Sequence, residues 1–249
     1  MSLFADYHNF VVIIGWDKFS DLVVEQLVST KRQIIALVDD EQTAERINST
    51  YDNRQVIALK VDYFNLQKLN KLPLERAFGA YINLASDRDR LIYIFKLRKA
   101  FPELSIISPI LNPKLKESFA SHRKIFPLSR DVISAKIFAS HLFKRDVANF
   151  LNQLLTPSVD ENDHELRQYL VLPENPFCSE MYGDAFIKLK KDFNTVLVGI
   201  SKLHAQGGYQ LRKNPTDETL IQKGDYLIVL VNGKSAKELE KIFGVGEGS

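Results

Sequence analysis

Apolar runs alternate with helical patterns over the first half of the chain. The first run, residues 10–14, is continuously apolar, as in a central parallel strand that is buried on both faces. Helical patterns separate it from the runs that follow, so the sequence predicts a doubly wound, Rossmann-like α/β sheet over residues 8–128 with right-handed crossovers. The further strands are expected at 33–38, 55–61, 80–85, 104–107 and 124–126.

The pattern changes at residue 129. Residues 129–155 form a long helical pattern that is apolar on more than one face. A helix of this kind at the end of a sheet domain packs either within its own domain or against something outside it. We interpret residues 129–155 as a crossover helix through which two copies of the chain pair.

A polar, acidic segment with one proline follows at 156–165 and is the expected linker. Beyond it, short apolar runs are separated by Pro, Gly and Asn turns, which is typical of a small α+β domain. The sequence therefore predicts a C-terminal lobe over residues 166–245. Its strands are expected at 169–172, 185–189, 196–200 and 226–231, and its last helix at 235–243.

The first strand ends at a loop that keeps part of a dinucleotide-binding motif. That motif requires glycine at positions 15, 17 and 20, but only Gly15 is present, with Asp17 and Ser20 at the other two. Asp17 is also a suitable N-cap for the helix that follows. A carboxylate about 4 Å from a phosphate costs roughly 4 kcal/mol at an effective dielectric constant near 20. An adenine nucleotide or NAD is therefore a candidate ligand with a weakened site, and the cofactor is left open.

Other candidate ligand-binding residues follow the strands, at the edge where open α/β sheets bind ligands. Asp39 has the right place to accept hydrogen bonds from a ribose, or it opens the next helix together with Asp40. Asp62 contacts a base, caps a helix or forms a turn. Asp87 and Arg88 follow the fourth strand, where Arg88 or Arg90 supplies phosphate charge or simply begins a solvated helix.

Trp16 places a large ring beside the candidate phosphate loop. The ring either covers the nucleotide pocket or packs against a neighbouring protomer, and the sequence does not separate these alternatives. The candidate cofactor-binding set is Gly15, Trp16, Asp17, Asp39, Asp62, Asp87 and Arg88.

Composition excludes several functions. The net charge is +2 and the basic residues are scattered, which does not favour nucleic-acid binding. Cys178 is the only cysteine, so neither a disulfide nor a multi-cysteine metal site is expected. The sequence has no nucleophile elbow and no Gly-Lys-Ser/Thr phosphate loop, so we expect no catalytic residues. No apolar run reaches the roughly 18–20 residues needed to cross a bilayer, and the chain is expected to be soluble.

Several segments together resemble the RCK family, the domains that regulate potassium conductance and consist of a TrkA-N and a TrkA-C part. Residues 8–16 resemble the opening of channel-type members, in which Gly-Trp replaces the full glycine motif. Asp39 and residues 61–62 resemble the ends of the second and third strands. The resemblance covers about residues 8–245, and its specificity lies in the order of the segments. The remaining similar segments are 84–87, 195–200 and 220–229.

The resemblance implies a cytoplasmic domain that senses a ligand and gates a potassium channel at the cytoplasmic face of the membrane. Members form homodimers that assemble into a ring, and a ring of eight copies is implied here. The partner would be the channel pore or, alternatively, the membrane subunit of a potassium transporter. A third hypothesis is an NAD-dependent oxidoreductase, but we find no residue in this sequence that would transfer the proton. Calcium-gated members carry glutamates just after the fifth strand; Pro109 and Leu111 stand in that segment here, so no metal site is expected.

Overall fold

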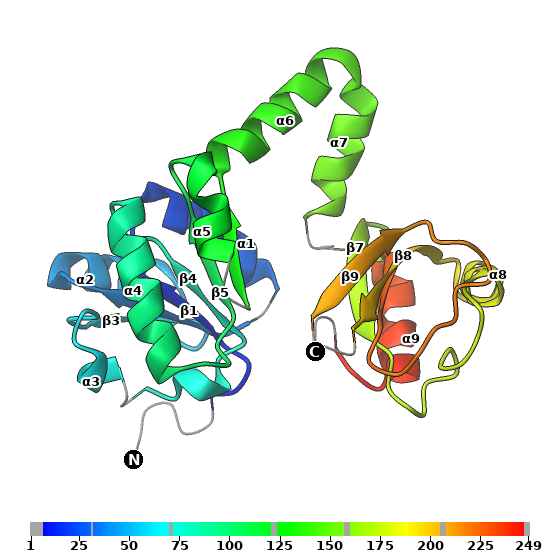
Figure 1. Ribbon diagram of the computed structural model, residues 1–249, viewed down its shortest axis with the longest axis horizontal. Coiled ribbons are helices and arrows are strands. Elements are labelled where there is room, and N and C mark those ends of the chain that lie inside the picture. Colours follow the sequence, from blue (N-terminus) through cyan, green and yellow to red (C-terminus); the bar gives the residue numbers. More distant parts are fainter. Residues whose placement is uncertain are drawn as a thin grey trace. The chain divides into compact units, whose positions relative to one another are not determined.

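Six parallel strands form the sheet of the N-terminal half in the computed structural model, which confirms the predicted Rossmann-like fold (Figure 1). The strand order is β3-β2-β1-β4-β5-β6. Strands β2 and β3 lie on one side of β1, and strands β4 to β6 lie on the other, so the strand order reverses between β1 and β4. The structure describes residues 7–30, 32–69, 72–120, 124–156, 160–204 and 208–246. The strands are β1 (Val11–Ile14), β2 (Ile34–Val38), β3 (Val56–Lys60), β4 (Gly79–Ile82), β5 (Ile106–Pro109) and β6 (Ile125–Leu128).

Successive side chains of β1 enter two different cores. Val12 and Ile14 belong to the cluster under α3, α4 and α5, whereas Val11 and Ile13 belong to the cluster under α1 and α2. This double burial explains why the strand is continuously apolar. The helical elements of this half are α1 (Lys18–Ser29), α2 (Glu41–Thr50), α3 (Leu66–Leu69), η1 (Leu74–Arg76), α4 (Asp87–Ala100), η2 (Pro113–Leu115) and α5 (Lys116–Ala120).

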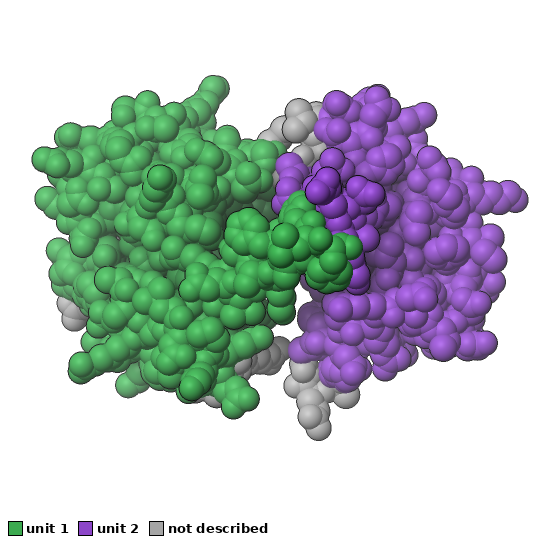
Figure 2. Space-filling model, turned by 90° about the horizontal axis from the view of Figure 1, so that it is seen from above, with its two compact units in different colours: residues 1–143 green, residues 144–249 purple. Residues whose placement is uncertain are grey.

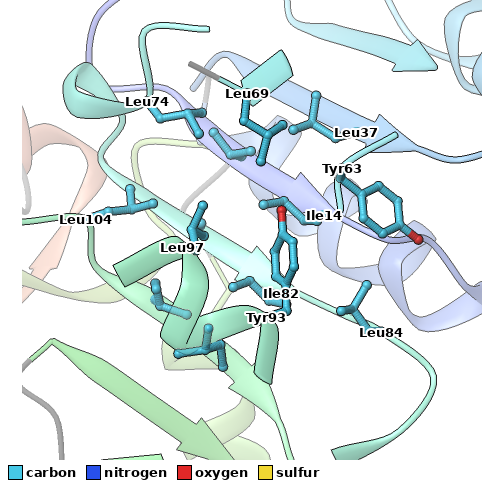
Figure 3. Packing of buried hydrophobic residues seen from close by; sticks show 14 of the residues in the cluster. Ile14, Leu37, Tyr63, Leu69, Leu74, Ile82, Leu84, Tyr93, Leu97 and Leu104 are labelled. Atoms are coloured by element: carbon cyan, nitrogen blue, oxygen red, sulfur yellow. The ribbon is translucent and has the colours of Figure 1, made fainter. Parts of the chain in front are cut away.

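The larger core is built around Tyr93 of α4 (Figure 3). The Tyr93 ring is 1% exposed and lies among side chains that come from strands, such as Ile14 and Ile82. Tyr63, which follows β3, makes an edge contact with Tyr93, with their ring centroids 6.2 Å apart. The core therefore fastens the loop after β3 to α4 and fixes the carboxyl edge of the sheet.

The predicted crossover helix is two helices rather than one. Helix α6 spans Arg130–Phe143 and helix α7 spans Arg145–Leu154. Between them Lys144 has φ −137° and ψ 54°, far from the dihedral angles of an α-helix, so the helix is interrupted at this residue. The break falls where the chain passes between its two compact units, Met1–Phe143 and Lys144–Ser249, which Figure 2 colours separately. Two helices form because α6 belongs to the first unit and α7 packs in the second.

Four antiparallel strands in the order β7-β10-β8-β9 form the sheet of the second unit. The expected linker, 156–165, overlaps this sheet because β7 already begins at His164, and residues 157–159 lie outside the described residues. The elements are β7 (His164–Leu170), α8 (Tyr182–Phe193), β8 (Val196–Leu203), β9 (Tyr209–Lys213), β10 (Tyr226–Asn232) and α9 (Gly233–Phe243).

The strand expected at 185–189 is wrong, because these residues lie inside α8. The buried residues of α8 are Tyr182, Ala185 and Leu189, which are separated by three and four positions, as on one face of a helix. The apolar run was too short to show that period by itself.

A buried acidic residue explains one segment of the family resemblance. Asp225, which is 1% exposed, lies directly before β10 in the turn of residues 222–225. Its carboxylate accepts from Lys202 Nζ at 2.6 Å, from Gln222 N at 2.8 Å and from Leu203 N at 3.0 Å. Gly224 supplies the left-handed φ of +85° that the turn requires. This segment therefore has a structural role within the C-terminal unit.

Candidate functional site

Gly15 ends β1 in a conformation that only glycine adopts easily. Its φ is +79°, and its N–H donates to the Leu37 carbonyl at 3.0 Å. A Cβ atom at this position would lie 2.4 Å from the Asn83 carbonyl oxygen, just beyond β4. The turn geometry and the close approach of two loops therefore require Gly15 whether or not a ligand binds.

Asp17 and Ser20 replace the missing glycines with a capping box at the start of α1. The Asp17 carboxylate accepts from Ser20 N at 2.9 Å, and Ser20 Oγ accepts from Asp17 N at 3.3 Å. These bonds satisfy N–H groups that a bound phosphate would otherwise use. The N-cap prediction for Asp17 is confirmed, and the helix N-terminus is occupied by the protein's own carboxylate.

Arg130, the first residue of α6, is the main site residue that sequence reasoning missed. Its guanidinium lies 3.4 Å from Asp17 Oδ2 and donates to Asn83 Oδ1 at 2.8 Å. Asn83 in turn donates to Ser20 Oγ at 2.9 Å. A separation of 113 residues from Asp17 leaves no sequence signal for this pair. Partial burial by itself raises the pKa of Asp17, but the hydrogen bond from the Ser20 amide and the charge of Arg130 lower it by more. The pKa of Asp17 therefore lies below its usual value.

Trp16 packs within its own unit. Its ring contacts the core cluster beneath α1 and α2, and its Nε1 donates to Asp21 Oδ1 at 3.0 Å. Asp21 also forms an ion pair with Arg46 of α2 at 3.2 Å. These contacts hold the indole against α1 and α2, beside the Gly15 loop.

Asp39 follows β2, the neighbour of β1, and Asp62 follows β3, one strand further from β1. Asp40, not Asp39, caps α2, because Thr43 N donates to its carboxylate at 2.7 Å. The Asp39 carboxylate instead accepts from the Tyr63 hydroxyl at 3.4 Å. Burial, with Asp39 adding to it, raises the pKa of Tyr63 to about 12, so this hydroxyl stays protonated. Asp62 is exposed, and its carbonyl accepts from Asn65 N in a turn.

Asp87 at the start of α4 binds backbone rather than being presented to solvent. Its carboxylate accepts from the amides of Leu111 and Asn112 at 2.9 and 2.8 Å and from Arg90 at 2.8 Å. Burial raises the pKa of Asp87, but these partners lower it below its usual value. Arg90 is 3% exposed and paired to Asp87, whereas Arg88 lies exposed on the same turn. Of the two arginines considered for phosphate, Arg88 is the accessible one.

The structure thus brings Gly15, Asp17, Asn83 and Arg130 together where β1 and β4 end, with Asp39 one strand away. This is the point at which open α/β sheets bind ligands. Asp17 forms a helix cap and an ion pair with Arg130, and Arg130 also donates to Asn83. These contacts connect α1, the end of β4 and α6. Among the described residues, no cluster of three or more His, Cys, Asp or Glu side chains is arranged to hold a metal ion.

Replacing Asp17 with glycine is expected to strengthen binding of ADP about tenfold, or about 1.4 kcal/mol. Glycine retains most of the N-cap's stability, while the substitution removes a repulsive carboxylate and leaves Arg130 available for phosphate. Isothermal titration with ADP measures the change. Asp40→Gly, which alters the same kind of cap on α2, is the matched control and should leave binding unchanged. Unchanged or weaker binding in Asp17→Gly contradicts the repulsive role of Asp17.

The fold and the site define a Rossmann-type domain whose Gly15 loop is filled by its own side chains. Residues 11–124 match the family model of the TrkA-N domain, and this match confirms the predicted resemblance to RCK domains. A comparison with curated proteins found no match.

The human SLO3 gating ring shares the fold at low sequence identity: it is 12% identical, with a TM-score of 0.65, and the alignment covers 94% of this chain and 46% of that one. Two further solved structures match with lower TM-scores. The GsuK RCK domain is 16% identical, with a TM-score of 0.43, and the alignment covers 98% and 50%. The TrkA-N domain of the Escherichia coli inner membrane protein ybaL is 14% identical, with a TM-score of 0.49, and the alignment covers 55% and 99%. The chain spans about half the length of the first two.

Proposed function

We propose that this chain is a regulatory domain of a potassium channel, which pairs with a second copy and assembles into a ring at the cytoplasmic face of the membrane. The TrkA-N match and the fold shared with a channel gating ring support the potassium function. The free-standing regulatory subunit of a potassium transporter is the same module without a covalent pore, and it is the second candidate. In the described part of the chain, no helix has both the length and the apolar character to span a bilayer.

The exposed apolar side chains of α6 are the observation that carries the assembly. No residue of α6 is buried, and Phe138, Leu142 and Phe143 are 70%, 89% and 71% exposed. Soluble monomers seldom expose so many large apolar side chains on one short segment. We call the exposed apolar residues of α6 the crossover patch and propose that a second copy of the chain covers them. They are Val132, Ile133, Ile137, Phe138, Leu142 and Phe143. In the second unit, Val147, Phe150 and Leu151 of α7 and its C-cap Leu155 are exposed apolar residues as well.

A second set of exposed apolar residues supports assembly of the pairs into a ring. Phe19 and Leu22 of α1 are 36% and 52% exposed, and Ile92 and Phe95 of α4 are 44% and 41% exposed. Helices α1 and α4 cover opposite faces of the sheet. Two different surfaces on opposite sides of one unit suit the head-to-tail contacts that build rings. We propose four pairs, giving a ring of eight copies.

Ligand control follows from linkage. A ligand shifts the ring between two states only by the difference between its affinities for them. We propose that an adenine nucleotide or NAD binds at the sheet edge where β1, β2 and β4 end, with Asp39 at the ribose and the Gly15 loop near the phosphates. The site groups described above support binding without bond-making, so we propose no enzymatic activity.

Thermal unfolding with NAD, NADH, ADP, ATP, AMP and calcium tests the ligand proposal. One nucleotide should raise the unfolding midpoint, because a ligand at a hundred times its dissociation constant adds about 2.7 kcal/mol. Asp39→Asn should abolish the shift, whereas Asp52→Asn, which alters a surface ion pair with Arg54, should retain it. No shift with any nucleotide, or a shift with calcium alone, contradicts a nucleotide site at this edge of the sheet.

A further inference from the structure

We propose that Asp17, Asn83 and Arg130 form a latch that joins the Gly15 loop to the crossover helix α6. Arg130 is the first residue of α6 and donates to Asn83 Oδ1 at 2.8 Å, beyond the end of β4. The same guanidinium lies 3.4 Å from Asp17 Oδ2, at the N-terminus of α1. One side chain thus holds three elements of the first unit together. The inference rests on the proposed function and deepens it, because it connects the proposed ligand site with the assembly helix.

Packing around Arg130 shows that the latch is built rather than incidental. Its side chain is 28% exposed, and its Cζ lies 4.2 Å from the centre of the Phe19 ring, a cation–π contact. Burial raises the pKa of the Tyr81 hydroxyl on β4 to about 12, and Arg130 and Asp17 lie close enough to act on it, Arg130 lowering it and Asp17 raising it. Arg130 is therefore partly buried among aromatic and polar groups.

Burial contributes little to holding the first turn of α6. No residue of α6 is buried, and the chain reaches the helix directly from β6 through Ser129. Ser129 contributes local bonds, since its Oγ accepts from Val132 N at 3.4 Å and its carbonyl accepts from Ile133 N at 3.1 Å. Arg130, through Asn83 and Asp17, ties the start of α6 to the carboxyl edge of the sheet. Breaking this tie should loosen the helix without unfolding the sheet.

The latch and an anionic ligand depend on the same groups. A phosphate at the start of α1 would take the place of the Asp17 carboxylate and would attract the Arg130 guanidinium, which binds phosphate in a bidentate manner. Arg130 would then leave Asp17, and the first turn of α6 would lose its attachment. By reciprocity, a partner that fixes α6 with the latch closed would weaken anion binding. Anion binding at the Gly15 loop and release of the first turn of α6 are therefore coupled in one equilibrium.

Hydrogen exchange of the full chain, read by mass spectrometry on individual segments, tests the latch. Asp17→Asn retains the N-cap and removes the charge, so the fold should persist while the amides of residues 131–136 exchange at least about threefold faster. Arg130→Gln should do the same. The double variant should exchange no faster than Arg130→Gln alone, because both substitutions break one interaction. Arg46→Gln, which breaks the ion pair between Arg46 of α2 and Asp21 of α1, is the control and should leave this segment unchanged.

Two results would overturn the latch. One is exchange of residues 131–136 in Asp17→Asn that is no faster than in the Arg46→Gln control. The other is a double variant in which the effects of Asp17→Asn and Arg130→Gln add, which would mean that the two residues act independently. A chain that stays monomeric contradicts the proposed assembly instead and leaves this test intact, since both residues belong to one unit.

Discussion

Replacing Gly15 with alanine is expected to destabilise the N-terminal unit by about 3–5 kcal/mol, even without a ligand. A side chain held at a φ of +79° costs about 1–2 kcal/mol. The new Cβ would also lie 2.4 Å from the Asn83 carbonyl oxygen, a backbone atom that moves only if β4 shifts. A domain is stable by only about 5–15 kcal/mol, so this loss would remove much of the unit's stability.

Trp16 makes the measurement selective, because it is the only tryptophan in the chain and lies in the first unit. Its fluorescence should report a lower unfolding midpoint in Gly15→Ala than in the wild type. Gly208→Ala is the matched control, since Gly208 has a φ of +92° with nothing within 4 Å of its added Cβ. It should cost about 1 kcal/mol in the second unit, followed by circular dichroism. Equal losses in the two variants would show that the contact with Asn83 does not matter.

Replacing both Phe138 and Leu142 with glutamate is expected to abolish pairing. These side chains are 70% and 89% exposed on α6, and a pair of copies would bury four of them. At about 1.5 kcal/mol each, their loss removes about 6 kcal/mol and weakens association by roughly four orders of magnitude. Sedimentation velocity over a range of protein concentrations measures the change.

The fold of that double variant should be intact, because neither residue packs in a core cluster. Ile187→Glu is its control: Ile187 is 62% exposed on α8, outside the crossover patch, and this variant should pair like the wild type. Wild-type assembly by Phe138→Glu/Leu142→Glu would show that the crossover patch is not the pairing surface.

Parallel strands were predictable wherever burial on two faces made the sequence continuously apolar, as in β1 and β2. Strand β9 was not, because all five of its side chains are exposed and none marks an inward face. The break at Lys144 carries no proline or glycine, so no local sequence pattern marks it. It falls between α6, which buries no residue, and α7, which buries Ala148 and Leu154 in the second unit.

The part of the site that directly follows a strand could be predicted from the sequence. Gly15 and Asp17 could be recognised by comparison with a glycine motif, and the capping role of Asp17 follows from the helix after it. Arg130 and Asn83 could not, because their partners lie on other strands and helices. The hydrogen bonds of Asp87 could not be predicted for a similar reason, because they come from backbone amides of Leu111 and Asn112, and almost every residue has such an amide.

The capping box gives the Gly15 loop a built-in competitor for anions. The Asp17 carboxylate is tethered beside the Ser20 N–H that it binds, so its effective concentration there lies in the millimolar range or above, as for short intramolecular connections. A free anion has to displace it at the same position. The nucleotide concentration that half-fills the site would therefore be higher than with glycine at position 17. One carboxylate, where related motifs carry a glycine, would set the concentration range over which the loop responds.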